Sequence, residues 1–220
     1  MPGHSCLCHP GGVHPTDDPA TDHALLVPGS PFTAPELQLM AQTGMVRPLL
    51  GGLYRSAATP ADAALRAAAV LQIAAPVLAG HWCAVGRTAA WVHVGGTAPT
   101  RLEAAVSHFH RPPALAVALP LVLRQLDVAA PAGHTAEAQE DVQILHGLRC
   151  TTPDRTLEDL LRDSADGSVD LALEHTAQRL AGCTHPAALR ARFERRRRLP
   201  GMLQARERLE AVLERTVVTV

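Results

Sequence analysis

The stretch GLRCTTPDRTLEDLLR, residues 147–162, decides the fold, because it joins a short extended segment directly to a helix with clear start signals. Thr152 offers its hydroxyl as the helix N-cap, and Pro153 follows at a position where a missing N–H costs nothing. Asp154 adds a negative charge at the positive end of the helix. The leucines recur at the spacing of a buried helical stripe: Leu157, Leu160 and Leu161. A strand that runs into an amphipathic helix predicts a domain that contains both kinds of element.

The same helix carries Arg155 and Asp159 four positions apart, and therefore on one face. On an exposed helix such a pair contributes only a few tenths of a kcal/mol. If Arg155 is partly buried, its guanidinium can join the helix to the sheet through bidentate bonds to a carboxylate or to backbone carbonyls. We predict this structural role for Arg155, in preference to direct contact with a partner protein.

Capping signals predict two more helices nearer the N-terminus. The capping box Thr33-Ala34-Pro35-Glu36 opens a short helix that Gly44 closes. Gly51-Gly52 then predicts the turn of a hairpin. A second capping box, Thr59-Pro60-Ala61-Asp62, opens a helix that reaches about Ala75. A helix followed by a hairpin is the pattern of a recognition helix and its wing.

The remaining patterns alternate between strands and helices. Strands are expected at residues 77–84, 102–107 and 119–128, with a strand pair at 142–150. Helices are expected at residues 88–94, 153–163, 168–181, 186–198 and 202–214. The fold class is therefore α+β: a short N-terminal winged-helix-like module, then a mixed α/β domain with a helical C-terminal tail.

Four segments follow from these elements. Residues 1–30 are rich in Pro, Gly, His and Asp without apolar periodicity, which predicts a disordered leader that is dispensable for stability. Residues 31–58 form the winged-helix-like module, residues 59–163 the α/β core domain and residues 164–220 the helical C-terminal region.

Charge is unevenly distributed along the 220-residue chain, although the net charge is only −1. Residues 137–174 hold ten acidic residues against three arginines, whereas residues 190–215 hold nine arginines against four glutamates. Aromatic residues make up 3% of the chain, which argues against a protein that stacks single-stranded bases. No signal peptide is apparent, and polar and proline residues interrupt the longest apolar stretch, 67–85. A cytoplasmic protein without a membrane partner is expected.

Cysteine and histidine clusters offer two weak metal-site patterns. Cys6-x-Cys8-His9 could bind a soft metal together with nearby histidines, but the cysteines are too close for a structural zinc site. His108-x-His110 places two imidazoles on one strand face, and surface histidines are the preferred interpretation. The five dispersed cysteines are expected to be reduced thiols. No metal or cofactor is predicted.

Signatures of catalysis are also missing. No nucleophile elbow accompanies Cys83, Cys150 or Cys183, and a phosphate-binding P-loop is excluded because the chain has no lysine. Buried cysteines that act as small hydrophobic residues are the default interpretation. We therefore predict that the protein is not an enzyme and has no small-molecule substrate.

Three motifs, in this order, resemble those of actinobacterial AbiEi-family antitoxins, which belong to type IV toxin–antitoxin systems. The first runs from Pro31-Phe32-Thr33 to Tyr54 and is similar to the end of that family's winged helix-turn-helix. The second, Arg87-Thr88-Ala89-Ala90-Trp91-Val92-His93, resembles a helix of its C-terminal domain. The third is the stretch 147–162. The resemblance implies a DNA-binding transcriptional autoregulator whose second domain neutralises a nucleotidyltransferase-like toxin.

The resemblance also implies candidate contact residues. In the module, the candidates for operator DNA are Thr33, Gln38, Gln42, Arg47 and Arg55. Apart from the resemblance, the charge of the arginine run in the tail suggests phosphate contacts or contact with an acidic toxin surface, which adds four candidates: Arg195, Arg196, Arg197 and Arg198. A solvated charged face is the competing interpretation of that run. The residues expected to carry the structural motifs are Arg87, Trp91, Thr152, Arg155 and Asp159.

The sequence departs from the family at its N-terminus. A winged helix-turn-helix needs three helices before the wing, and only the one from Thr33 to Thr43 is evident here. A recognition helix without supporting helices is poorly held in the major groove. The alternative is therefore an orphan structural or interaction protein that keeps the fold but has lost operator binding.

Overall fold

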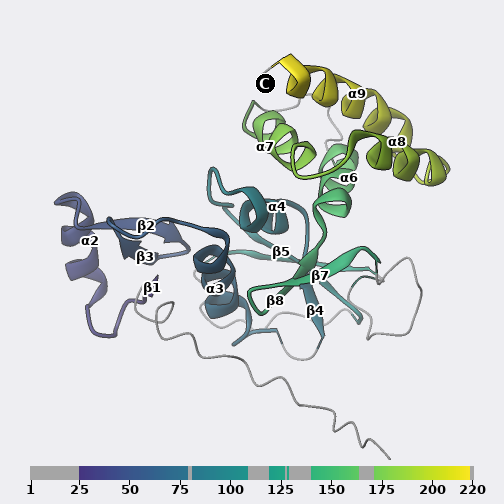
Figure 1. Ribbon diagram of the computed structural model, residues 1–220. Helices are drawn as coiled ribbons and strands as arrows, with labels where there is room; N and C mark the ends of the chain where they lie inside the picture. The colour runs from purple at the N-terminus through teal and green to yellow at the C-terminus, as the bar shows by residue number, and fades with distance from the viewer. Residues whose placement is uncertain are drawn as a thin grey trace, which may run out of the picture.

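The computed structural model describes residues 25–78, 81–108, 119–126, 128, 140–163 and 171–218. These residues form a mixed α+β structure of seven helices and two sheets, as predicted. A small three-stranded sheet with one helix lies at one end, a five-stranded sheet lies in the middle, and a group of helices lies at the other end (Figure 1).

The N-terminal module consists of β1 (Leu25–Leu26), α2 (Ala34–Gln42), β2 (Val46–Leu50) and β3 (Leu53–Ser56). The predicted capping box is present, since the Thr33 side chain accepts from the Glu36 N–H and the Glu36 carboxylate accepts from the Thr33 N–H. Both glycines of the β2–β3 turn, Gly51 and Gly52, have positive φ. The three strands pair in the order β1-β3-β2, with every pairing antiparallel.

The expectation that residues 1–30 lack structure is wrong for its last part. Leu25 pairs with Arg55, and Leu26 pairs with Tyr54, so this segment is an edge strand of the small sheet. Leu25 and Val27 also pack against the central core. Two or three apolar residues are too few for a recognisable strand pattern, and their partner strand lies about thirty positions further along the chain. Residues 1–24, including the Cys6-x-Cys8 cluster, lie outside the described residues.

Helix α3 (Ala63–Ala74) connects the module to the central sheet. The predicted capping box at Thr59 is wrong, because the N-cap is Asp62, whose carboxylate accepts a hydrogen bond of 2.8 Å from the Leu65 N–H. Asp is an N-cap of the same quality as Ser or Thr, and the helix therefore starts three positions later than predicted.

The central sheet has the strand order β6-β5-β4-β8-β7. Its strands are β4 (Trp82–Ala84), β5 (Leu102–Val106), β6 (Leu121–Gln125), β7 (Val142–Leu145) and β8 (Leu148–Thr151). The central strand β4 pairs antiparallel with β5 and parallel with β8. The β7–β8 hairpin turns at His146 and Gly147, which both have positive φ. The sheet thus brings the stretch 147–162 beside a strand from the middle of the chain.

Five helices complete the described structure: α4 (Gly86–Val94), α6 (Pro153–Asp163), α7 (Leu171–Ala181), α8 (Pro186–Arg195) and α9 (Met202–Val218). One hydrophobic core joins leucines of the β2–β3 hairpin to α3, α4 and the central sheet. A second core joins one face of α4 to α6, α7, α8 and α9. Helix α4 therefore lies between the two cores, and α8 ends at Arg195, three positions earlier than predicted.

Candidate functional site

Helix α2 and strand β2 carry the predicted DNA-contact residues of the module. Leu37 is the only buried residue of α2, and Gln38 and Gln42 are exposed on it. Arg47 is exposed on β2. The Thr33 hydroxyl is engaged in the capping box, where it lies 2.8 Å from the Glu36 carboxylate. Three of the predicted side chains are thus free to meet a ligand, and Thr33 has a structural role.

Arg55 does not belong to this exposed face. Its guanidinium donates to the carbonyl oxygens of Ser56, at 3.1 Å, and Thr59, and so closes the turn that follows β3. These bonds give Arg55 a structural role, and its contact with DNA stays a prediction. Its side chain stabilises the end of the hairpin.

The C-terminal arginines lie far from α2, since α2 and α8 are at opposite ends of the molecule (Figure 1). Arg195 and Arg198 are exposed, and Arg197 pairs with Glu194 at 3.1 Å. Arg196 is different, because its guanidinium reaches inward to two buried carboxylates. The two predicted groups of DNA-contact residues do not form one surface, and Arg196 is corrected to a structural residue.

Those two carboxylates, Asp141 and Glu158, are the centre of a buried ion-pair network that we call the junction network. Asp141 is 1% exposed and Glu158 is fully buried, so each needs cationic partners. The cations come from α6 and from α8 with its C-cap residue: Arg155, Arg162, Arg192 and Arg196. Charged groups removed from water in this way persist only when they are well paired.

Ion pairs of the junction network join α6, α8 and the residue that precedes β7. Arg155 Nη1 lies 2.6 Å from Asp141 Oδ2, and Arg155 Nε lies 2.9 Å from Asp159 Oδ1. Arg192 links the two carboxylates, with Nη1 2.7 Å from Asp141 and Nε 2.7 Å from Glu158. The predicted bridging role of Arg155 is confirmed: it connects α6 to the residue that precedes β7. The stretch 147–162 therefore holds the sheet to the C-terminal helices.

Hydrogen bonds to Asp141 set its protonation state. Burial alone would raise the pKa of this carboxyl, but hydrogen bonds and charge from Arg192 and Arg155 outweigh it, and the pKa is lowered. Burial alone would lower the pKa of Arg155, but the carboxylates of Asp159 and Asp141 raise it. Asp141 is thus ionised in the folded protein.

Sequence reasoning identified Arg155 and Asp159 but missed the two central carboxylates. Glu158 follows Leu157 and precedes Leu161 by three positions, which places it beside the apolar stripe of α6. A charged residue next to a buried stripe is the one signal that could have identified it. Asp141 carries no such signal, because it precedes its strand as many solvated aspartates do.

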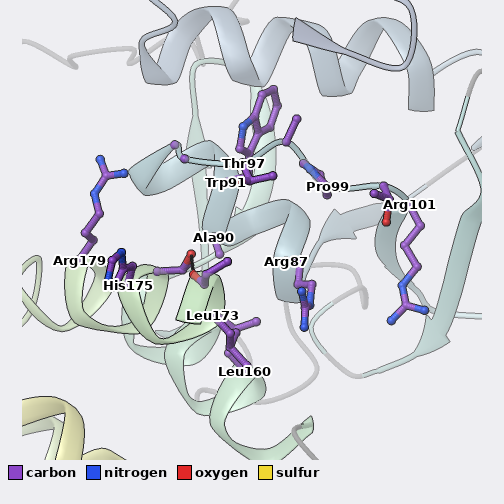
Figure 2. A pocket seen from close by; sticks show the side chains of 16 residues that line it. Arg87, Ala90, Trp91, Thr97, Pro99, Arg101, Leu160, Leu173, His175 and Arg179 are labelled. Atoms are coloured by element: carbon purple, nitrogen blue, oxygen red, sulfur yellow. Dashed lines mark hydrogen bonds between the residues drawn. The ribbon is translucent and has the colours of Figure 1, made fainter. Parts of the chain in front are cut away.

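A second candidate site is a pocket of about 530 Å³ between α4, the loop 95–101 and α7. Figure 2 shows Arg179 and His175 on the α7 side, Arg87 at α4 and Arg101 at the far end of the loop. Trp91, which is 4% exposed, contributes to the lining and otherwise belongs to the central core, as predicted. Arg87 had been expected in a structural motif, and only its backbone N–H has that role, donating to Glu103 Oε2 at 3.1 Å.

Buried thiols do not form a nucleophilic site in the described structure. Burial raises the pKa of Cys83 to about 12 and that of Cys150 to about 11. His93 Nε2 lies 4.0 Å from Cys150 Sγ, but the same nitrogen lies 2.7 Å from the Thr151 carbonyl oxygen. Because that nitrogen donates its proton to the carbonyl, it is unable to act as a base toward the thiol.

Among the described residues, no group of three or more His, Cys, Asp and Glu side chains is placed to hold a metal ion. The described helices include none that combines the length and apolar character of a membrane span. No protein-family model matches this chain, and no curated protein is significantly similar to it. The antitoxin resemblance therefore depends on the three sequence motifs.

Proposed function

We propose that the protein is an antitoxin-like DNA-binding regulator. In this proposal the α2–β2–β3 module contacts operator DNA, and the larger part of the protein, the central sheet with its helices, binds a nucleotidyltransferase-like toxin. The observation that carries the DNA-binding half is the attachment of α2, which has Leu37 as its only buried residue and leads directly into the β2–β3 hairpin. A helix held this way presents nearly its whole surface outward beside a wing.

The exposed side chains of this surface suit a nucleic acid. Gln38 and Gln42 are one helical turn apart, and glutamine can bind the N6 and N7 edge of adenine in the major groove. Arg47 on the adjacent strand is placed to contact a phosphate. The module therefore combines two groups that read bases with one that positions the protein.

The test is fluorescence anisotropy with a labelled duplex from upstream of the protein's own gene, measured over a range of salt concentrations. Gln38→Ala and Gln42→Ala should each weaken binding by about 1–3 kcal/mol at a specific site. Arg47→Gln should weaken it for all sequences and reduce the salt slope by about 1. Arg190→Gln, at an exposed arginine of α8 that is not among the predicted DNA contacts, is the matched control and should change nothing. Absence of salt-sensitive binding would exclude the DNA-binding half.

One observation favours the second candidate, an interaction protein without operator binding. The face around α2 includes two exposed apolar side chains, Leu39 (61% exposed) and Met45 (56% exposed). Among the described residues of this face, Arg47 is the exposed cation without an ion-pair partner. Exposed apolar side chains are typical of protein contacts more than of phosphate contacts. Leu39→Glu should then abolish a protein contact and leave DNA affinity at its background level. Size-exclusion chromatography with the product of the neighbouring reading frame measures the first effect.

A further inference from the structure

Among the described residues, the lining of the pocket between α4 and α7 includes arginines and no acidic side chain. The arginines are Arg87, Arg101 and Arg179. Arg101 is partly neutralised, since it lies 3.4 Å from the buried Glu103. Arg87 and Arg179 are exposed, and neither forms an ion pair with any residue that the structure describes. Two cations that face the pocket are therefore without a counterion among the residues that the structure describes.

A third cation lies behind the loop. The guanidinium of Arg66 is buried and donates to the carbonyl oxygens of Val92, at 2.9 Å, and His93, at 3.3 Å, at the end of α4. Burial lowers the pKa of Arg66, the negative charge of Asp62 raises it, and the positive charge of Arg179 lowers it by less than Asp62 raises it. The effect of Arg179 indicates that the two guanidinium groups lie near each other. An anion bound between them would reduce their repulsion.

The loop 95–101 is built to pass close to these cations. Gly95 has a φ of 67°, and a Cβ atom at this position would lie 3.0 Å from Arg66 Nη1. Gly96 has a φ of 93°, and its Cβ position lies 3.9 Å from Arg179 Nη1. Side chains at Gly95 would displace Arg66, so glycine is required where the backbone meets the buried guanidinium.

Apart from His175, the rest of the lining combines apolar side chains with hydroxyl groups. Leu160, Leu173 and Ala90 contribute hydrocarbon surface, and Thr97, Thr100 and Thr176 contribute hydroxyl groups. His175 lies one turn from Arg179 on α7, and Figure 2 shows the two side chains next to each other. A volume of about 530 Å³ lies within the range of pockets that bind small molecules. The ligand must then combine an anionic group with an uncharged organic part.

We propose that this pocket binds a phosphate monoester of a small organic molecule, with the phosphate at Arg179 and His175 and the organic part extending toward Arg87. A phosphate monoester carries nearly two negative charges and several acceptor oxygens, which matches guanidinium donors better than a single carboxylate does. Arg87, at the opposite side in Figure 2, binds the far polar end of the ligand. The site is independent of the DNA-binding proposal, because it uses none of the residues of α2 and β2.

Isothermal titration calorimetry on the full chain tests the proposal with four probes: adenosine monophosphate, glucose 6-phosphate, inorganic phosphate and adenosine. At least one of the two esters should bind saturably at millimolar concentration or below, and more tightly than inorganic phosphate and adenosine. The ester that binds identifies the organic part. Arg179→Gln should weaken its binding at least about tenfold, and Arg87→Gln should weaken it by a smaller factor. Arg198→Gln should bind like the unchanged protein.

Both test substitutions replace exposed side chains, so the variants should keep the melting temperature of the unchanged protein. The proposal fails if neither ester binds, or if inorganic phosphate or adenosine binds as tightly as the esters. It also fails if Arg198→Gln weakens binding as much as Arg179→Gln, since the attraction would then be general. Equal displacement of the ester by polyglutamate would indicate docking of an acidic protein segment and would overturn the proposal.

Discussion

Two aspartates near the start of α6 are in opposite electrostatic situations. Asp141 has three arginine partners, and its pKa is lowered. Asp154, in the first turn of α6, has no arginine ion-pair partner among the described residues, and burial raises its pKa more than the charge of Arg192 lowers it. Ionisation of Asp141 thus stabilises the folded state, whereas ionisation of Asp154 opposes it.

Asp141→Asn and Asp154→Asn should therefore change stability with opposite sign at pH 7. Asp141→Asn should reduce the free energy of unfolding by about 3 kcal/mol, because it removes one of the two carboxylates that each of Arg155, Arg192 and Arg196 contacts and leaves their buried charge only partly compensated. Asp154→Asn should increase it by less than about 1 kcal/mol, because this side chain is partly exposed and its charge is screened. Urea unfolding measures both.

The pH dependence separates the two effects further. Because the pKa of Asp141 is lower in the folded protein, its stabilisation is complete above the unfolded value of about 3.9 and is lost as the pH falls below it. Because the pKa of Asp154 is raised in the folded protein, ionisation of Asp154 lowers the free energy of unfolding at neutral pH. This destabilisation disappears as the pH falls through the raised pKa toward the unfolded value. The gain in Asp154→Asn should vanish over that interval. A gain that persists there would contradict a charge effect.

At the scale of elements, helix boundaries could be predicted where the signal lies in adjacent residues. The cap of α2 and the start of α6 were found from adjacent residues, because capping depends on side chains within one turn. The end of α8 was placed three residues too late. Arginine is a good helix former, so four consecutive arginines give no stop signal. The backbone leaves the helix at Arg196, whose guanidinium reaches carboxylates 38 and 55 positions away.

Arginines of this run should accordingly differ in their effect on stability. Arg196→Gln should lower the free energy of unfolding by about 1–3 kcal/mol, because it removes a donor to both carboxylates of the junction network. Arg195→Gln and Arg198→Gln are matched controls at exposed positions and should stay within about 0.5 kcal/mol of the unchanged protein. Thermal melts of the three variants decide this. Equal melting temperatures of the three variants would show that the ion pairs of Arg196 do not stabilise the folded protein.

At the scale of the whole molecule, the N-terminal module and the body share one core. Leu49, Leu50 and Leu53 of the hairpin belong to the same buried cluster as α3, α4 and the central sheet. The order β6-β5-β4-β8-β7 was beyond sequence reasoning, because strand partners come from distant positions such as Ala84 and Cys150. The fold class followed from composition and periodicity, whereas the pocket did not, since its lining comes from three segments that only the packing brings together.

A chain that begins at Pro31 should be less stable than one that begins at Ala24. The shorter chain lacks β1, which pairs with β3, and the apolar contacts of Leu25 and Val27 with the core. A loss of about 2 kcal/mol corresponds to roughly 4–8 °C in melting temperature for a protein of this size. Calorimetry of both chains measures the difference. Coincident melts would show that β1 contributes nothing.

The order of synthesis gives the junction network one further consequence. Asp141 and Glu158 leave the ribosome well before Arg192 and Arg196, which follow Glu158 by 34 and 38 positions. At about 5–20 residues per second, the carboxylates wait on the order of seconds for these partners. During that interval Asp141 can already pair with Arg155, whereas its other arginine partners are still missing. We therefore expect the junction network to be completed, and α8 to pack against α6, only after Arg196 has emerged.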